Sequence, residues 1–152
     1  MSLVLRILFW FRRIYQFIAH PINLGVRIML IRDKKVLLVR HVYEHGWFMP
    51  GGGVKRKETL EQAARRECYE EVGVELQEME LFGIFFNYTQ WKSDHIALFL
   101  SKDFTIADKQ DSEIAEKKFF ALDDLPKSLG SGHRRRLQEY QAGIKQVQHG
   151  VW

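Results

Sequence analysis

The stretch GGVKRKETLEQAARRECYEEVGV, residues 52–74, decides the fold of this chain. After its glycines and basic residues, the spacing predicts a helix over 58–72, since Ala63 and Ala64 recur on one apolar face. Gly73 then ends the helix, because glycine readily adopts the left-handed backbone found after a last helical turn. A glycine-rich loop therefore leads directly into a helix at the centre of the domain.

The inner face of this helix becomes acidic in its last two turns. Glu67 and Glu71 continue the apolar stripe, and Glu70 lies beside it. Because residues three and four apart on a helix lie about 5–6 Å from each other, these carboxylates converge and repel one another. Two interpretations fit the pattern: a solvated acidic patch on a surface helix, or a site for a hard divalent cation, which prefers oxygen ligands.

The loop before the helix favours the cation interpretation. Three consecutive glycines, at positions 51–53, allow backbone groups to approach an ion or a phosphate closely. Lys55, Arg56 and Lys57 then place three positive charges beside the start of the acidic helix. A loop that can bind phosphate, next to a helix that can hold a metal, indicates phosphoryl-group chemistry.

Residues 52–74 resemble the Nudix box, whose pattern is G-x5-E-x7-R-E-U-x-E-E-x-G-U, with U an apolar residue. The fixed positions are filled by Gly52, Glu58, Arg66, Glu67, Glu70, Glu71 and Gly73. Cys68 and Val74 occupy the apolar positions, and Lys57 stands where many members have glycine. The resemblance extends over about residues 24–147 and excludes the N-terminal segment.

The resemblance implies an α/β fold, a Nudix-type α/β/α sandwich with a mixed sheet. It also implies an enzyme that hydrolyses a phosphoanhydride bond in a nucleoside diphosphate linked to another group, with Mg2+ or Mn2+ as cofactor. The residues it assigns to the metal are Gly51, through its carbonyl, Glu67, Glu70 and Glu71. Glu67 is alternatively the general base, Arg66 would orient the acids, and Glu58 would help to hold the turn between loop and helix.

Residues that would read the substrate lie mostly outside the motif. The candidates are Arg40, Lys55 and Lys57 for phosphate, Trp47 for stacking on a base, and Glu113 and Glu116 as a further acid from a downstream loop. Each also has a plain structural explanation, as a surface charge or a packing residue. The expected partner is a nucleotide, nucleotide sugar or dinucleotide. The alternative function is a nucleotide-sensing module with little catalysis.

The composition of the 152 residues, 46% hydrophobic and 28% charged, is that of one globular domain. The net charge is +4, and three basic residues, Arg6, Arg12 and Arg13, lie in the first 20 residues, which contain no acid. The near-neutral remainder argues against a nucleic-acid-binding protein. The single cysteine, Cys68, excludes an internal disulfide, and we expect a cytoplasmic location.

Residues 3–19 predict an amphipathic helix that Pro21 ends, with a wide apolar face and a basic edge. We therefore divide the chain into an N-terminal amphipathic helix, residues 1–22, and a Nudix hydrolase domain, residues 23–152. The charge-free part of this segment is too short to span a bilayer. The helix either packs on its own domain or on a partner subunit in a homodimer, or lies peripherally on a membrane.

Short apolar runs between turn signals predict the remaining elements. Residues 25–32 and 36–42 form a hairpin around residues 33–35. Further strands are predicted at 76–88, 95–103 and 117–122. A last helix covers 132–147, and we expect the basic run at 133–136 to form a solvated face rather than a nucleic-acid site.

Overall fold

The computed structural model describes residues 10, 22–89, 92–107, 109, 111–144 and 147–152. The helix predicted over residues 3–19 lies outside these ranges except for Trp10, so it stays a prediction, as does the division of the chain at residue 22. Within the described ranges, no helix is long and apolar enough to cross a membrane.

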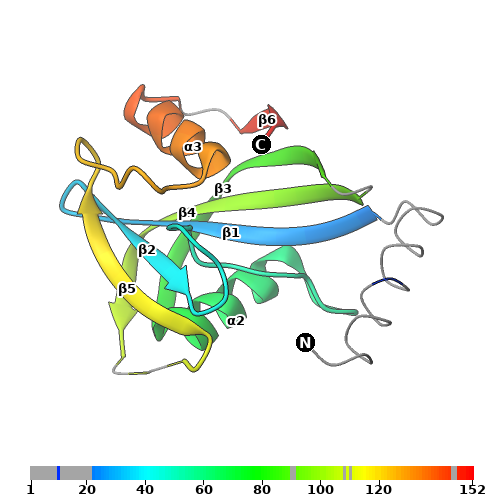
Figure 1. The fold of residues 1–152 in the computed structure, drawn as a ribbon, viewed down its shortest axis with the longest axis horizontal. Coiled ribbons are helices and arrows are strands. Elements are labelled where there is room, and N and C mark those ends of the chain that lie inside the picture. Colours follow the sequence, from blue (N-terminus) through cyan, green and yellow to red (C-terminus); the bar gives the residue numbers. More distant parts are fainter. Residues whose placement is uncertain (1–9, 11–21, 90–91, 108, 110, 145–146) are drawn as a thin grey trace.

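In the described part of the chain, six strands form one mixed sheet (Figure 1). They are β1 (Ile22–Arg32), β2 (Lys35–His41), β3 (Val74–Thr89), β4 (Lys92–Ile106), β5 (Ile114–Ala121) and β6 (Gln148–Val151), in the order β5-β2-β1-β4-β3-β6. β1 runs parallel to β4, and β3 runs parallel to β6. Helix α2 (Leu60–Val72) lies on one face and α3 (Ser131–Gln141) on the other, which confirms the predicted α/β/α sandwich.

The predicted hairpin is confirmed as β1 and β2, and it is mostly apolar because both faces of the sheet are covered. Val26 and Ile28 belong to the core under α2, whereas Met29 belongs to the core under α3. This alternation follows from the two-residue period of a strand. Asp33 and Lys34 at the turn both have positive φ, 50° and 58°, the type I′ geometry that joins adjacent antiparallel strands.

Helix α2 is capped at both ends by the residues that flank it, Thr59 and Gly73. The Thr59 side chain accepts the Gln62 N–H and the Gln62 side chain accepts the Thr59 N–H, which is a capping box. Gly73 has φ 68°, and its N–H donates to the Tyr69 carbonyl. The predicted end at Gly73 is confirmed. The predicted start at residue 58 is wrong, because Thr59 takes the capping position and the helix begins at Leu60.

The last helix is shorter than predicted. α3 ends at Gln141, and Gly143 has φ 76°, so the backbone leaves the helix there. The predicted extension to residue 147 is wrong, since the helical spacing of apolar residues continued beyond a glycine that ends the helix. The residues that follow form β6, which pairs with β3. This pairing joins residues far apart in the chain, and no local pattern predicts it.

The expectation that the basic run at 133–136 is a solvated face is wrong for two of its four residues. His133 and Arg136 are only 5% and 3% exposed, because positions three apart on α3 turn toward the sheet together with Leu137. Arg136 donates to the carboxylate of Glu139 at 2.6 Å and to the carbonyl of Val151 at 3.1 Å. Arg136, the last residue of the run, therefore links α3 to β6 through its hydrogen bond to Val151.

Burial of His133 makes the stability of the fold depend on pH. Its Nδ1 accepts the Met49 N–H at 3.3 Å, and burial, together with the charge of Arg27, lowers the pKa of the imidazole to about 3. An unfolded histidine has a pKa of about 6.5, so the neutral side chain stabilises the fold above that pH, and this stabilisation is lost as pH falls toward 3.

We therefore expect His133→Asn to weaken the pH dependence of stability. Asparagine keeps an acceptor for the Met49 N–H but does not titrate. The variant should show about 2 kcal/mol less loss of unfolding free energy between pH 7 and pH 5 than the parent chain. Urea denaturation at both pH values measures this difference. An equal loss in the two proteins would show that His133 is not the titrating group.

Candidate active site

The glycine loop is held against β1 at the centre of the sheet. The N–H groups of Val26 and Ile28 donate to the carbonyls of Gly52 and Pro50, both at 2.9 Å. Gly51 has φ 136°, and a Cβ at this position would overlap the Val26 carbonyl. Position 51 therefore requires glycine, and the course of the loop is set before it reaches α2.

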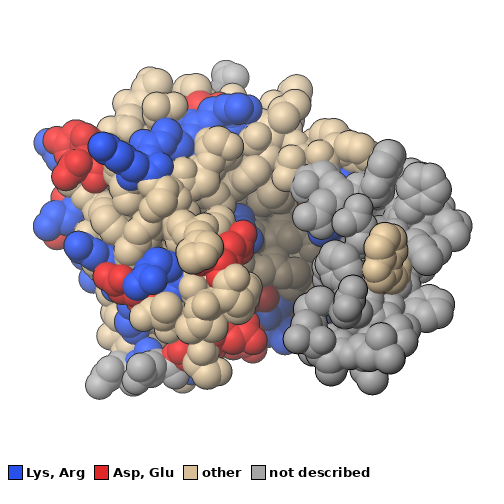
Figure 2. Space-filling model, in the orientation of Figure 1, with Lys and Arg blue, Asp and Glu red and all other residues tan. Residues whose placement is uncertain are grey.

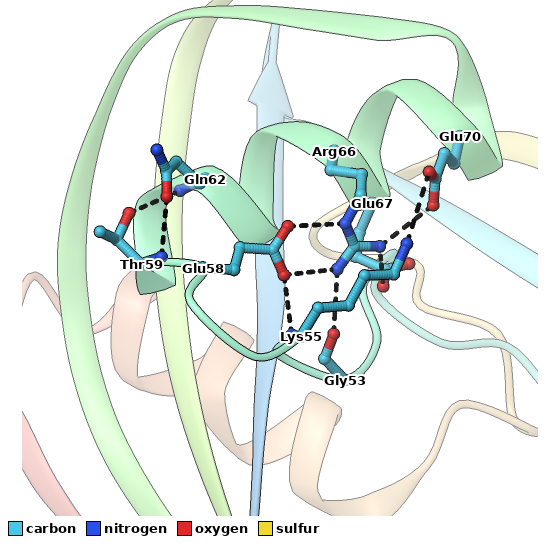
Figure 3. Close-up of polar contacts among 8 residues, drawn as sticks. All are labelled: Gly53, Lys55, Glu58, Thr59, Gln62, Arg66, Glu67 and Glu70. Atoms are coloured by element: carbon cyan, nitrogen blue, oxygen red, sulfur yellow. Dashed lines mark hydrogen bonds and ion pairs between the residues drawn. The ribbon is translucent and has the colours of Figure 1, made fainter.

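One guanidinium, that of Arg66 on α2, contacts three carboxylates and the loop (Figure 3). Its Nε and Nη2 donate to the two oxygens of Glu58 at 2.7 and 2.9 Å, which is a bidentate pair. Its Nη1 donates to Glu67 at 2.6 Å and to Glu70 at 3.0 Å. Its Nη2 also donates to the Gly53 carbonyl at 3.0 Å. These contacts fit the positioning roles that the resemblance implies for Arg66 and Glu58.

The pairing between Arg66 and Glu58 keeps both of these side chains charged. Hydrogen bonds from the Arg66 side chain and the Lys55 N–H lower the pKa of Glu58 to about 2. The pairing with Glu58 in turn raises the pKa of Arg66 further above its usual value. The side chains of Glu58 and Glu67 are each 13% exposed and that of Arg66 is 18% exposed, so water screens these pairs only in part. The carboxylates tolerate one another because a guanidinium lies between them.

Glu71 lies apart from this cluster and faces the loop. Its Oε2 accepts the Gly51 N–H at 2.9 Å. Burial raises the pKa of the Glu71 carboxyl to about 7, although the Gly51 N–H and the charge of Arg27 act in the opposite direction. The Arg27 guanidinium, whose pKa burial lowers, donates to the carbonyls of Gly51 and Met49. Glu71 is thus a carboxyl whose negative charge is only partly balanced.

Gly52 leaves room for the Glu67 carboxylate, since a Cβ at position 52 would lie 2.6 Å from Glu67 Oε1. We expect Gly52→Ala to displace this carboxylate and lower kcat at least about tenfold, because small misplacements at a reacting centre are costly. Gly53→Ala is the matched control and should keep its activity, because a Cβ there meets nothing within 4 Å. Steady-state kinetics measure both, with circular dichroism to compare folding. Full activity in Gly52→Ala would contradict this geometry.

The donor set suits a hard divalent cation. Glu67, Glu70 and Glu71 present carboxylate oxygens from the last turns of one helix, and the Gly51 carbonyl adds a backbone oxygen from the loop. Among the described residues, no three His, Cys, Asp or Glu side chains already surround one point. Arg66 and the Gly51 N–H hold the carboxylates instead. A bound ion would replace part of these contacts.

Three of the candidate substrate-reading residues have their contacts with residues outside the Arg66 cluster. Arg40 and Glu116 pair with each other at 2.9 Å across β2 and β5, with 46% and 44% of their side chains exposed. Trp47 packs edge-on against Phe120, with ring centroids 4.7 Å apart, and so joins the core under α3. The packing explanation of Trp47 and the surface-charge explanation of Arg40 and Glu116 thus match the contacts seen.

The remaining candidates lie on two loops. Lys55 reaches the acidic helix, with 3.9 Å between its Nζ and Oε1 of Glu70. Lys57 is exposed and has φ 66°, a conformation that favours glycine, which explains why glycine is common at this position in the family. The carbonyl of Glu113 accepts the Val42 N–H, which places Glu113 beside the end of β2. Of these residues, Lys55 contacts the acidic helix.

Arg27 is a residue of the site that sequence reasoning missed. It stands alone as a charge within the apolar run of β1, and a charge inside a covered strand needs a partner. Its guanidinium donates to the Gly51 carbonyl in the glycine loop and is attracted by the negative charge of Glu71. The negative charge of Glu44 acts to raise the pKa of Arg27, and the negative charge of Asp111 acts to raise the pKa of Glu71. These two acids lie on separate loops, and no local pattern points to them.

Both signs of charge are mixed over the face shown in Figure 2. Lys and Arg side chains gather at the top of this view, over α3, while Asp and Glu side chains are interspersed with basic ones below. This mixture agrees with the near-neutral charge of the chain after residue 20.

Comparisons with known proteins bear on the same site. A family model described as NUDIX domain matches residues 21–140. RNA pyrophosphohydrolases of Aeromonas hydrophila and Psychromonas ingrahamii are 34% and 36% identical over 70 residues, 46% of this chain. The match spans only 39% and 38% of the length of these relatives.

Solved structures share the fold over most of the chain. A MutT NUDIX hydrolase from Burkholderia pseudomallei is 26% identical, with a TM-score of 0.71, and the match covers 77% of this chain and 96% of that one. A MutT protein from Methanosarcina mazei is 22% identical, with a TM-score of 0.72 over 83% and 97%, and supports the fold alone. Together with the family match and the complete motif at residues 52–74, these findings show that this chain belongs to the Nudix hydrolase family.

Proposed function

We propose that this chain is a pyrophosphohydrolase that cleaves a phosphoanhydride bond in a nucleoside diphosphate linked to another group, with Mg2+ or Mn2+ as cofactor. The observation that carries this proposal is the set of α2 carboxylates facing a glycine loop that is held to β1. Membership of the Nudix hydrolase family supports hydrolysis of a phosphoanhydride bond as the class of reaction. The cytoplasmic location stays a prediction from the single cysteine of the sequence, Cys68.

The carboxylates have separate tasks in this proposal. Glu67, Glu70, Glu71 and the Gly51 carbonyl would hold the metal, which when bound supplies Lewis acidity and a nucleophilic hydroxide near neutral pH. Arg66 aligns Glu67 and Glu70 through its two Nη1 contacts. Glu67 either binds the ion or takes the proton of the attacking water. Lys55, exposed beside Glu70, would meet the negative charge of the substrate phosphate.

The substrate is best found by a screen with both metals. We would test nucleotide sugars, dinucleotides and (d)NTPs, and also 5′-triphosphorylated RNA because curated relatives are named RNA pyrophosphohydrolases. Phosphate and pyrophosphate release would be measured with Mg2+ and with Mn2+, against Glu71→Gln as the inactive reference. From the near-neutral charge after residue 20 we expect a small nucleotide rather than RNA to be the best substrate.

Two outcomes would refute parts of this proposal. If no compound in the screen is cleaved above the Glu71→Gln level with either metal, the chain is not a pyrophosphohydrolase of this class. Tight binding of a nucleotide without turnover would instead identify a nucleotide-sensing module. The complete set of motif acids, Glu67, Glu70 and Glu71, favours the enzyme.

A further inference from the structure

The sheet has a surface of exposed apolar side chains at the end where β1 begins, on the face that α2 covers further along. We call it the strand-end surface. Its members are Ile22 and Leu24 on β1, Ile84, Phe86 and Tyr88 on β3, and Val151 on β6. These six side chains are between 39% and 76% exposed. Single exposed apolar residues are ordinary, but six at one end of the same sheet, on β1, β3 and β6, indicate a surface that binds something.

Strand register shows that the surface is continuous. Leu24 lies opposite His95 of β4, His95 opposite Phe86, and Phe86 opposite Val151, which makes one row across four strands. Residues directly opposite one another in a sheet project from the same face. Ile22 and Tyr88 form the next row outward, both opposite Ser93.

The strand-end surface continues the core that lies under α2. The next row inward contains Val26 and Ala97, which are 1% and 0% exposed and belong to that core. α2 covers the core with Ala63, Ala64, Cys68 and Val72, and leaves the rows nearer the start of β1 open. His95, in the middle of the open surface, has a buried Nδ1 without a partner among the described residues. The surface thus has the properties of an interior that lacks one covering element.

We propose that residues 3–19 of the same chain cover the strand-end surface as an amphipathic helix beside α2. The segment leads into Ile22, itself a member of the surface, and Pro21 separates the predicted helix from β1. Leu5 and Phe9 share the sector of the arginines, and the rest of the helix is formed by the apolar residues Leu3, Val4, Ile7, Leu8, Trp10, Phe11, Ile14, Phe17 and Ile18. A helix over 3–19 is about 25 Å long, which exceeds the roughly 14 Å across four adjacent strands.

The connection at Pro21 favours this occupant over a second copy or a membrane. A segment joined to its target through one or two residues has an effective concentration of about 1 mM or more when the geometry allows contact. The three arginines of the segment fall in one sector of the helix, so they can face water while the apolar side faces the sheet. Trp10 is 62% exposed in this structure, and the docked arrangement requires the apolar face that includes it to become covered.

Trypsin cleavage of the full chain tests the docking. Arg12 and Arg13 are cleavage sites that a docked helix protects. We expect Leu24→Asp to speed cleavage there at least tenfold, because a carboxylate in the strand-end surface opposes apolar contact. Ile106→Asp is the matched control, since Ile106 is 41% exposed against 45% for Leu24 and lies at the other end of the sheet. Mass spectrometry of the first fragments locates the cuts.

Crosslinking separates the possible occupants. In the full chain, Phe11→Cys with Tyr88→Cys should form an intramolecular link through a short bismaleimide, while the buried Cys68 stays unreactive. Links found only in dimers would show that a second copy covers the surface and would overturn the proposal. Protection of Arg12 and Arg13 that appears only with vesicles of phosphatidylcholine and phosphatidylglycerol would overturn it in favour of a membrane. Equally fast cleavage of the parent chain and Leu24→Asp would also overturn it.

Discussion

Glu71→Gln should lower hydrolysis at least about a thousandfold, because losing the charge of one metal ligand removes several kcal/mol of transition-state stabilisation. The amide oxygen of glutamine can still accept the Gly51 N–H, so the loop should stay in place. Rates with saturating Mg2+ and Mn2+, using the substrate from the screen, measure the effect. Glu61→Gln is the matched control, since Glu61 lies on the same helix but is exposed and pairs with Arg65.

The same variant should be more stable than the parent chain without metal. Burial raises the pKa of Glu71 to about 7 from an ordinary value of 4.5, so ionising it costs folding free energy as pH rises between these values. At pH 8 we expect Glu71→Gln to gain about 1–3 kcal/mol of unfolding free energy. The gain should shrink as pH falls and vanish only well below pH 4.5, where Glu71 is protonated in both the folded and the unfolded state. Reduced activity together with reduced stability would instead indicate a folding defect.

Arg66→Ala should cause the largest loss of stability among alanine substitutions of the charged residues on α2. It leaves Glu58, Glu67 and Glu70 facing one another and frees the Gly53 carbonyl. Breaking an exposed pair costs about 1 kcal/mol or less and breaking a buried pair about 3–5 kcal/mol, and we expect a loss between these values because all three pairs are partly buried. Activity should fall as well, since Glu67 and Glu70 lose the group that aligns them. Urea denaturation and steady-state kinetics measure the two effects.

Two further variants show whether the geometry of Arg66 or only its charge matters. Arg66→Lys keeps the positive charge but cannot make the bidentate pair with Glu58, so it should recover only part of the stability and activity. Arg65→Ala, next to it, removes an exposed pair with Glu61 and a hydrogen bond to the Leu76 carbonyl, and should cost about 1–2 kcal/mol. Equal losses in Arg65→Ala and Arg66→Ala would mean that the cluster around Arg66 has no special role.

The α2 part of the candidate site could be predicted from sequence because its residues are close together in the chain. Helical spacing alone places Glu67, Glu70 and Glu71 on neighbouring positions of one helix. Arg66 and Glu58 are eight residues apart, and the structure joins them through the turn that precedes α2. The hairpin of β1 and β2 was predictable for the same reason, since a turn and two adjacent apolar runs are local features.

Other parts of the fold depended on contacts between residues far apart in the chain. For these parts the sequence patterns gave a wrong prediction or no prediction. The apolar spacing after Gln141 predicted that α3 continues, although the backbone turns at Gly143 and residues 148–151 pair with β3. His133 and Arg136 were read as solvated because their run is basic, but α3 turns both toward the sheet. A charged residue type indicates exposure only on average, and burial is decided by which face of the helix meets the sheet.

The sequence by itself determined the family motif, the helix that carries the acids, the glycines before it and the α/β class. All of these follow from spacing within about twenty residues, where backbone geometry fixes which side chains are neighbours. The tertiary structure alone decided that Arg27 meets the glycine loop, that burial raises the pKa of Glu71, and that the strand-end surface is left open. These depend on strand order and on what covers each face, which arise from contacts between distant parts of the chain.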